Sequence, residues 1–321
     1  MLKRKTGASI DAPVFAGAET QPRWGLCCQF VDSPIKFRQA THRYVSTLGE
    51  KERIRYLSDI VQGNGEALAA AVLKCVDLGI GSFRITSQIM PLATHPVSGF
   101  RIDQLESPEA IIETYVAAGN LASKNGIRLS FHPDQFVVLN SLTELVVGSS
   151  VEEMNHHAAV AELIGAEALT LHVGGKVEGT ERALSRLERG IDMLNPSARQ
   201  MLALENDDRL FSPADLLPFC ERTGIPFIYD VHHHRCNSDG IPVTEATQRA
   251  IATWGGREPW MHISSPRDGW SAKDPRPHAE YIDPADFPEE WLGLKMTIDV
   301  EAKEKERAVL AIKRAIQERA A

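Results

Sequence analysis

The sequence lacks any apolar run long enough to cross a membrane. A spanning helix needs about 20 consecutive apolar residues, and no segment of the 321-residue chain approaches that length. We therefore expect no membrane partner. The first residues contain three basic side chains but no apolar core of signal-peptide length, so a flexible N-terminal tail over residues 1–22 is expected.

Cysteine and net positive charge are also scarce. The five cysteines are an odd number without metal-type spacing, and a cytoplasmic, reducing location is the simplest setting for them. The formal net charge of −8 weighs against a chain-wide basic surface, so a nucleic-acid partner would have to meet locally concentrated positive charge. No repeat or low-complexity run divides the chain. We therefore expect one domain over residues 23–321.

Short β-branched or apolar runs alternate with helix-length segments along the chain. Eight runs predict strands, at residues 24–30, 81–86, 127–131, 168–171, 201–204, 227–229, 260–263 and 296–300. Amphipathic stretches predict helices at 108–125, 151–165, 180–194, 213–223 and 303–319. The alternation indicates parallel strands with right-handed crossovers. Eight such units favour a single-domain α/β fold of the (β/α)8 TIM-barrel type over an open doubly wound sheet.

Six consecutive predicted strands, the third to the eighth, each deliver a histidine or a carboxylate at the same end. These residues are His132, His172, Glu205, Asp230, His262 and Glu301. In a parallel barrel all strand C-termini lie on one face, where barrel active sites are built. A single such residue would as readily cap a helix or face water, but six at equivalent positions indicate a metal site. Mixed imidazole and carboxylate ligands suit Zn²⁺, Mn²⁺ or Fe²⁺ better than Mg²⁺ or Ca²⁺.

Two further histidines extend this cluster. His233 stands three residues after Asp230, in the expected following loop, with His232 and His234 as alternatives, and His278 lies in a proline-rich loop. Since each metal takes about three or four protein ligands, eight residues predict two or three ions. Closely spaced metals serve phosphodiester hydrolysis. Sugar isomerases on the same barrel also use two metals, so the cluster indicates a metalloenzyme without fixing its substrate.

The segments around these residues resemble the UV-damage endonucleases, barrel enzymes related to endonuclease IV. The matching motifs are HPDQF (132–136), LHVGG (171–175), ALENDDRL (203–210), DVHHH (230–234), HISS (262–265), HAEYI (278–282), DVEAKEKE (299–306), FRITSQIMPLATHP (83–96) and RWGLCCQF (23–30). The resemblance implies an endonuclease, usually dependent on manganese and generally monomeric. It would incise damaged double-stranded DNA immediately 5′ of UV photoproducts or abasic sites, leaving 3′-hydroxyl and 5′-phosphate ends.

The resemblance also implies a role for each residue. It assigns three metals. The first would be held by His132, His172 and Glu205, and the second by Glu205, Asp230, His262 and Glu301. The third would be held by His233 and His278. Glu205 and Glu301 would anchor the catalytic cluster, and His95 would contact the phosphate. Gln135 and Phe136 would fill the gap left when damaged nucleotides leave the base stack.

Two departures from the family pattern affect these expectations. Trp260 stands where the family carries a lysine that ligates a metal, so the third site loses a ligand, and Leu26 stands where a tyrosine can occur. Lys176 and Arg235, which follow predicted strands, are candidates for phosphate contacts. Two other hypotheses remain open: a sugar isomerase or epimerase of the xylose-isomerase-like barrels, and a DNA-binding protein with weakened catalysis.

Overall fold

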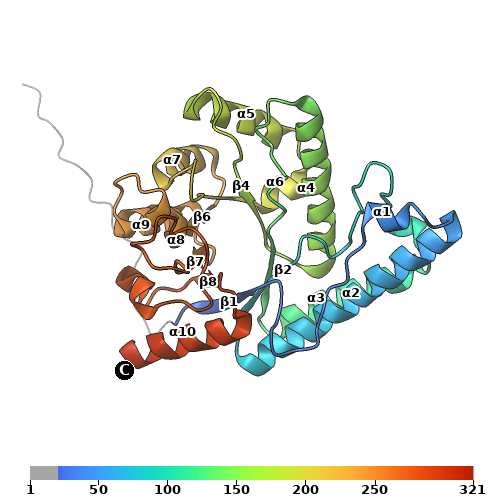
Figure 1. The fold of residues 1–321 in the computed structure, drawn as a ribbon, viewed down its shortest axis with the longest axis horizontal. Helices are drawn as coiled ribbons and strands as arrows, with labels where there is room; N and C mark the ends of the chain where they lie inside the picture. The colour runs from blue at the N-terminus through green and yellow to red at the C-terminus, as the bar shows by residue number, and fades with distance from the viewer. Residues whose placement is uncertain (1–20, 321) are drawn as a thin grey trace, which may run out of the picture.

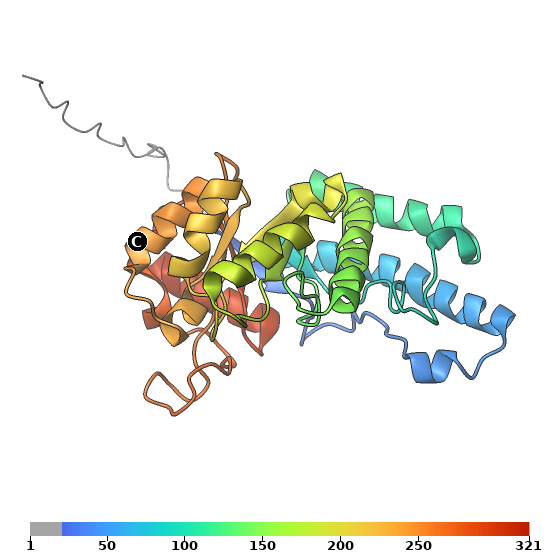
Figure 2. The same cartoon turned by 90° about the horizontal axis from the view of Figure 1, so that it is seen from above.

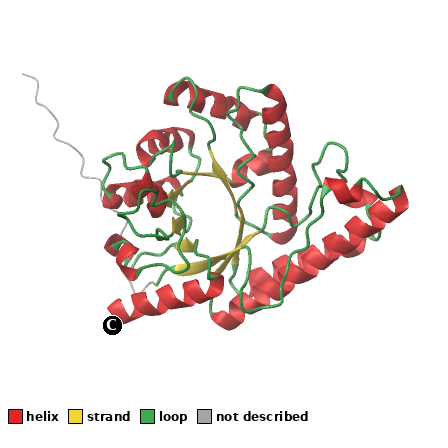
Figure 3. Cartoon of the chain, viewed as in Figure 1, coloured by secondary structure: helices red, strands yellow, loops and turns green. Residues whose placement is uncertain are grey.

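The computed structural model describes residues 21–320, which form a closed barrel of eight parallel strands. Figure 3 shows the strands as a central ring with helices around it. The strands are β1 (Arg23–Cys27), β2 (Ser82–Ile85), β3 (Arg128–Phe131), β4 (Ala168–His172), β5 (Leu202–Glu205), β6 (Phe227–Asp230), β7 (Trp260–Ile263) and β8 (Thr297–Val300). Each strand pairs with the next, and β1 pairs with β8. The predicted (β/α)8 barrel is thus confirmed. The tail expected over residues 1–22 lies outside the described residues, apart from Gln21 and Pro22.

The strands lie close to their predicted positions, with one exception. Seven of them begin and end within one residue of the apolar runs that predicted them. Such runs are buried on both faces because side chains fill the barrel interior and helices cover its outside. The first strand was predicted over residues 24–30 but ends at Cys27. It ends there because Cys28 has a φ of 64°, in the left-handed region, which turns the chain away from the strand ladder.

Ten α-helices connect and cover the strands in the described part of the chain. They are α1 (His42–Val45), α2 (Glu50–Leu78), α3 (Pro108–Lys124), α4 (Glu144–Ile164), α5 (Thr180–Asp192), α6 (Pro196–Met201), α7 (Pro213–Thr223), α8 (Val231–Cys236), α9 (Val243–Thr253) and α10 (Lys305–Ala320). Short 3-10 turns lie at η1 (Ile102–Gln104), η2 (Pro284–Asp286) and η3 (Glu289–Trp291). The α4 helix begins well before the predicted residue 151, and the segment between β1 and β2 holds the two helices α1 and α2.

Two long helices give the molecule its elongated outline. α2 and α3 lie side by side and extend beyond the barrel, with α1 near the far end of α2 (Figures 1 and 2). Tyr115 of α3 anchors the pair, because its hydroxyl donates to the carbonyl of Val61 in α2 at 3.1 Å. No helix within residues 21–320 is long and apolar enough to span a bilayer.

The barrel interior is built in layers. Successive side chains of a strand point to opposite faces, so residues two apart share a face. The strand-end residues His172, Glu205, Asp230, His262 and Glu301 therefore stand above a second set on the same faces. That lower set contains Thr170, Ala203, Ile228, Trp260 and Asp299, and every one of them is at most 2% exposed. The strand ends are thus supported by a solid floor of buried side chains.

Candidate metal centre

One group of possible metal ligands gathers where β3, β4 and β5 end. His132 follows β3, His172 is the last residue of β4, and Glu205 is the last residue of β5. The Nε2 atoms of His132 and His172 lie 2.9 and 3.5 Å from Oε2 of Glu205. One ligand atom from each residue lies within 4.8 Å of the other two, which is close enough for one ion.

A second group shares Glu205 and continues around the barrel. It consists of Glu205, Asp230, His262 and Glu301, whose ligand atoms also lie within 4.8 Å of one another. Nδ1 of His262 is 2.8 Å from Oε1 of Glu205 and 3.4 Å from Oε1 of Glu301. The two Glu205 oxygens thus face different groups, Oε2 toward His132 and His172 and Oε1 toward His262. This geometry suits a carboxylate that bridges two ions.

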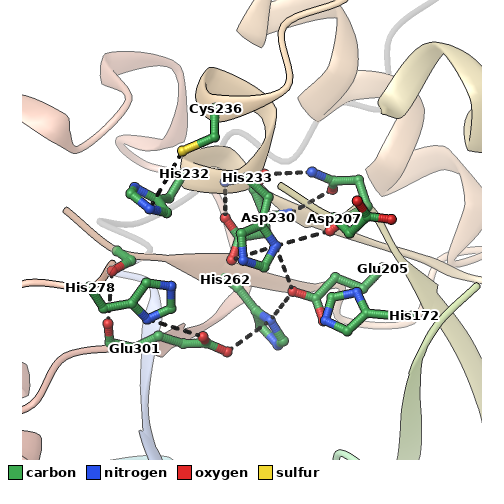
Figure 4. A network of polar contacts seen from close by, with 12 residues as sticks. His172, Glu205, Asp207, Asp230, His232, His233, Cys236, His262, His278 and Glu301 are labelled. Atoms are coloured by element: carbon green, nitrogen blue, oxygen red, sulfur yellow. Dashed lines mark hydrogen bonds and ion pairs between the residues drawn. The ribbon is translucent and has the colours of Figure 1, made fainter. Parts of the chain in front are cut away.

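His233 and His278 lie beside these two groups (Figure 4). Nδ1 of His233 is 3.5 Å from both Glu205 and Asp230, and Nδ1 of His278 is 3.6 Å from Glu301. Their ring centres are 6.1 Å apart. Neither histidine belongs to a group of three close ligand atoms within the described residues.

The histidine triplet lies in a helix, so the prediction of a loop there was wrong. Asp230 ends β6 and its side chain accepts a hydrogen bond from the backbone N–H of His233 at 2.8 Å, which starts α8. The helix separates the three rings. His233 faces Glu205, while His232 turns toward Cys236 (Figure 4) and His234 bonds to Tyr229.

The charges of the cluster are mutually dependent. Burial alone would raise the pKa of Glu205, but His262 and His172 hold it well below its ordinary value. Burial would lower the pKa of His262, but Glu205 raises it to about 9. Burial lowers the pKa of His172, against the effect of the neighbouring Glu205. Without metal, an ionised carboxylate therefore faces a protonated His262, and a divalent cation can replace such protons.

The donor set fits a divalent metal. Oδ2 of Asp230 is buried without a hydrogen-bond partner, and buried polar atoms of this kind normally have one. Imidazole nitrogens and carboxylate oxygens together suit Zn²⁺, Mn²⁺ or Fe²⁺. A cavity of about 420 Å³ opens onto the cluster and is lined by His132, His172, His233 and Glu301 among others.

Two residues that the sequence analysis did not single out adjoin the cluster. Arg84 of β2 lines the cavity and forms an ion pair with Glu301. The nearby guanidinium helps to hold the pKa of Glu301 well below its ordinary value, against the effect of burial. Asp299 of β8 lies 3.7 Å from His262. The signal for Arg84 was a charged side chain between Phe83 and Ile85 in a predicted strand.

The remaining predicted site residues line or adjoin the cavity, or have other partners. Gln135 lines the cavity, and Phe136 beside it is 77% exposed. His95 stacks on His42 of α1 with ring centres 4.4 Å apart. Lys176 donates to Asp215 at 2.8 Å. Arg235 donates to the carbonyl of Asp286 at 2.7 Å.

Comparison with known proteins gives the class to which this fold and site belong. The model of the family described as UV-endonuclease UvdE matches residues 22–320, so the chain belongs to the UV-endonuclease UvdE family, as the sequence resemblance indicated. It is 34% identical over 316 residues to the UV DNA damage endonuclease of Deinococcus radiodurans, covering 93% of this chain and 97% of that protein. It is 31% identical over 274 residues to the enzyme of that name from Bacillus cereus (strain ATCC 10987 / NRS 248), covering 82% and 84%.

Solved structures agree with this family membership. The crystal structure of SacUVDE superposes with a TM-score of 0.82 at 30% identity, covering 94% of this chain and 99% of that one. Endonuclease IV from Thermus thermophilus has a TM-score of 0.59 at 17% identity, covering 93% and 100%. A D-psicose 3-epimerase has a TM-score of 0.51 at 13% identity, covering 78% and 92%. The last two likenesses concern the barrel fold alone.

Proposed function

We propose that this chain is a metal-dependent endonuclease that incises damaged double-stranded DNA immediately 5′ of UV photoproducts, with abasic sites as further substrates. The ends left would be a 3′-hydroxyl and a 5′-phosphate. The observation that carries the proposal is the pair of ligand groups joined by Glu205, in a member of the UV-endonuclease family. When bound, closely spaced divalent ions, with manganese as the first candidate, activate water and stabilise the leaving oxygen in phosphodiester hydrolysis.

The residues of the cluster would hold these ions and balance the charge around the phosphate. His132 and His172 complete one site, while Asp230, His262 and Glu301 complete the other, each together with Glu205. Arg84 brings a cation to the same cavity. The negative charge of a phosphodiester would thus enter a pocket whose carboxylates are already neutralised.

Gln135 and Phe136 would recognise the distorted helix. Gln135 lines the cavity at the cluster, and the ring of Phe136 next to it is largely exposed. A damaged nucleotide pair leaves the base stack at lower cost than an intact one. The aromatic ring can then occupy the space left in the stack, which brings the neighbouring phosphate toward the metals.

The experiment is nicking of supercoiled plasmid, with UV-irradiated and unirradiated DNA, each with Mn²⁺ and with EDTA. We expect nicking of the irradiated plasmid only, and only with metal. A duplex with one photoproduct then gives the incision position, and polymerase extension of the nick tests for a 3′-hydroxyl. An abasic duplex tests the wider lesion range. Equal nicking of both plasmids, or nicking in EDTA, would contradict the proposal. Ketose turnover without nicking would support a sugar isomerase instead.

A further inference from the structure

Asp299 is a buried carboxylate directly behind a proposed metal ligand. It lies on β8 two residues before Glu301, on the same face of the strand, and its backbone is in register with His262 of β7. Oδ2 of Asp299 is 3.7 Å from Nε2 of His262. Both atoms are buried, and neither has a hydrogen-bond partner. Nε2 of His262 can therefore donate to Oδ2 of Asp299, and neither atom has another hydrogen-bond partner. An approach of about 0.5 Å would bring the two atoms into hydrogen-bonding range.

Trp260 and Gly25 hold Asp299 in this place. The indole Nε1 of Trp260 donates to Oδ1 of Asp299 at 3.2 Å, so that Oδ2 remains free for His262. Gly25 of β1 leaves the space for the carboxylate, because a Cβ there would lie 2.0 Å from Oδ1. A more distant contact to the same oxygen comes from the Ser82 hydroxyl at 3.5 Å.

The Trp260 indole is itself fixed in the barrel floor. The guanidinium of Arg128 lies 3.7 Å from the centre of the ring, a separation typical of a cation–π contact. The ring packs with Ala168, Ala203 and Ile228 in one buried cluster, and the two alanines leave room for its volume. The side chain that supports Asp299 is therefore buried and packed on several sides.

The consequence concerns which nitrogen of His262 meets a metal. Nδ1 faces Glu205 and Glu301, and Nε2 faces Asp299. In metal sites, a carboxylate behind an imidazole keeps the proton on the far nitrogen, orients the ring and raises the basicity of the coordinating nitrogen. We propose that Asp299 is a positioning residue that presents Nδ1 of His262 to the metal, and that Trp260 orients Asp299 for this task. This inference rests on the metal-binding part of the proposed function.

The test measures metal binding without DNA. Asp299→Asn removes the charge and keeps the shape of the side chain. Trp260→Phe removes the indole donor and part of the ring. Ser82→Ala removes the more distant hydroxyl contact to Asp299 and serves as a matched control. Mn²⁺ affinity is measured by the electron paramagnetic resonance of the free ion. Zn²⁺-loaded protein with ¹⁵N-labelled histidine reports which nitrogen of His262 carries the proton. Thermal melts in EDTA establish that each variant is folded.

We expect the wild type to show a proton on Nε2 and metal on Nδ1. Asp299→Asn should weaken binding at the site containing His262 by about 10- to 100-fold, with a mixed His262 tautomer and a retained site at His132 and His172. Trp260→Phe should cause a smaller loss in the same direction, and Ser82→Ala should bind as the wild type does.

Two outcomes would overturn the inference while leaving the proposed function intact. One is affinity within twofold of the wild type in a folded Asp299→Asn protein, and the other is an equal loss at both sites. If Asp299→Asn does not fold, Trp260→Phe decides, and unchanged affinity and tautomer there would overturn it. A wild type that binds no metal would remove both the inference and the metal dependence of the proposed function.

Discussion

Replacing Glu205 with glutamine is the most direct test of the candidate site. The substitution keeps the size of the side chain and removes its charge. Glu205 is fully buried, and its oxygens lie 2.8 Å from His262, 2.9 Å from His132 and 3.5 Å from both His172 and His233. It is also the one residue common to both groups of possible ligands. A single change of charge therefore reaches every part of the cluster.

The size of the effect follows from this burial. In the metal-free protein, the change leaves a protonated His262 without its closest counter-ion, and removing one partner of a buried pair costs about 3–5 kcal/mol. For metal binding, a shared ligand is lost from two sites. The loss of affinity should therefore exceed the roughly 100-fold that changes behind a ligand can cause. Nicking of irradiated plasmid should fall to the level of the wild type in EDTA.

The assay compares metal content and stability with those of a matched variant. Glu258 is a mostly buried carboxylate at the other end of the barrel, paired with Arg23 at 2.8 Å and Arg128 at 3.5 Å. Glu258→Gln should lower the free energy of unfolding measured in urea but leave metal content, measured by mass spectrometry after dialysis, unchanged. The reasoning is refuted if Glu205→Gln retains the metal content of the wild type.

Three further predictions follow from individual contacts. In metal-free protein, the pKa of His262 is about 9 against about 6.5 unfolded. The stabilisation of the folded protein by protonated His262, on the order of 3 kcal/mol, should be complete below about pH 6.5 and lost as pH rises through about 9. A free energy of unfolding, measured in urea with EDTA, that does not change with pH over this range would argue against it. Gly25→Ala should lower stability by about 1–3 kcal/mol, because its Cβ would lie 2.0 Å from Asp299. Gly148→Ala, in α4, should not lower stability, because the added Cβ would meet no atom outside its own stretch of helix within 4 Å. Thermal melts of both variants check this. Phe136→Ala should leave the melting temperature unchanged, because the ring is 77% exposed, and should weaken binding to irradiated DNA by about 10- to 100-fold if one stacked base is lost. Fluorescence anisotropy measures the affinity for irradiated DNA. Leu145→Ala, at a side chain that is 80% exposed, is the control. Equal losses of affinity for both variants would count against a specific role of Phe136 in filling the base stack.

The fold was predictable because one pattern determined most of it. Apolar runs of strand length alternated with amphipathic segments, and eight parallel strands with such connections close into a barrel. The same closure explains why residues as far apart as His132 and Glu301 were expected on one face. Their distances along the chain did not matter, because each stood at the end of its own strand.

Local geometry was less predictable where partners come from distant segments. The sequence did not show that Cys28 adopts a left-handed backbone, which ends β1 early. Nor did it show that Asp230 starts a helix at the histidine triplet. Lys176 and Arg235 were expected to contact phosphate because they follow strands. In the structure, Lys176 forms an ion pair with Asp215 and Arg235 forms one with Asp286.

The position of Trp260 bears on how many ions the proposed metal centre would hold. The resemblance places a ligand lysine there, but the indole lies in the buried layer below His262, against Arg128 and Asp299. A side chain held in that layer supports the second site and supplies nothing to His233 and His278, whose rings are 6.1 Å apart. Within the described residues, close ligand atoms form two groups, and both contain Glu205. The packing of the barrel floor thus offers no further ligand to His233 and His278, and the two groups joined by Glu205 are the ones to which the proposed function assigns its metal ions.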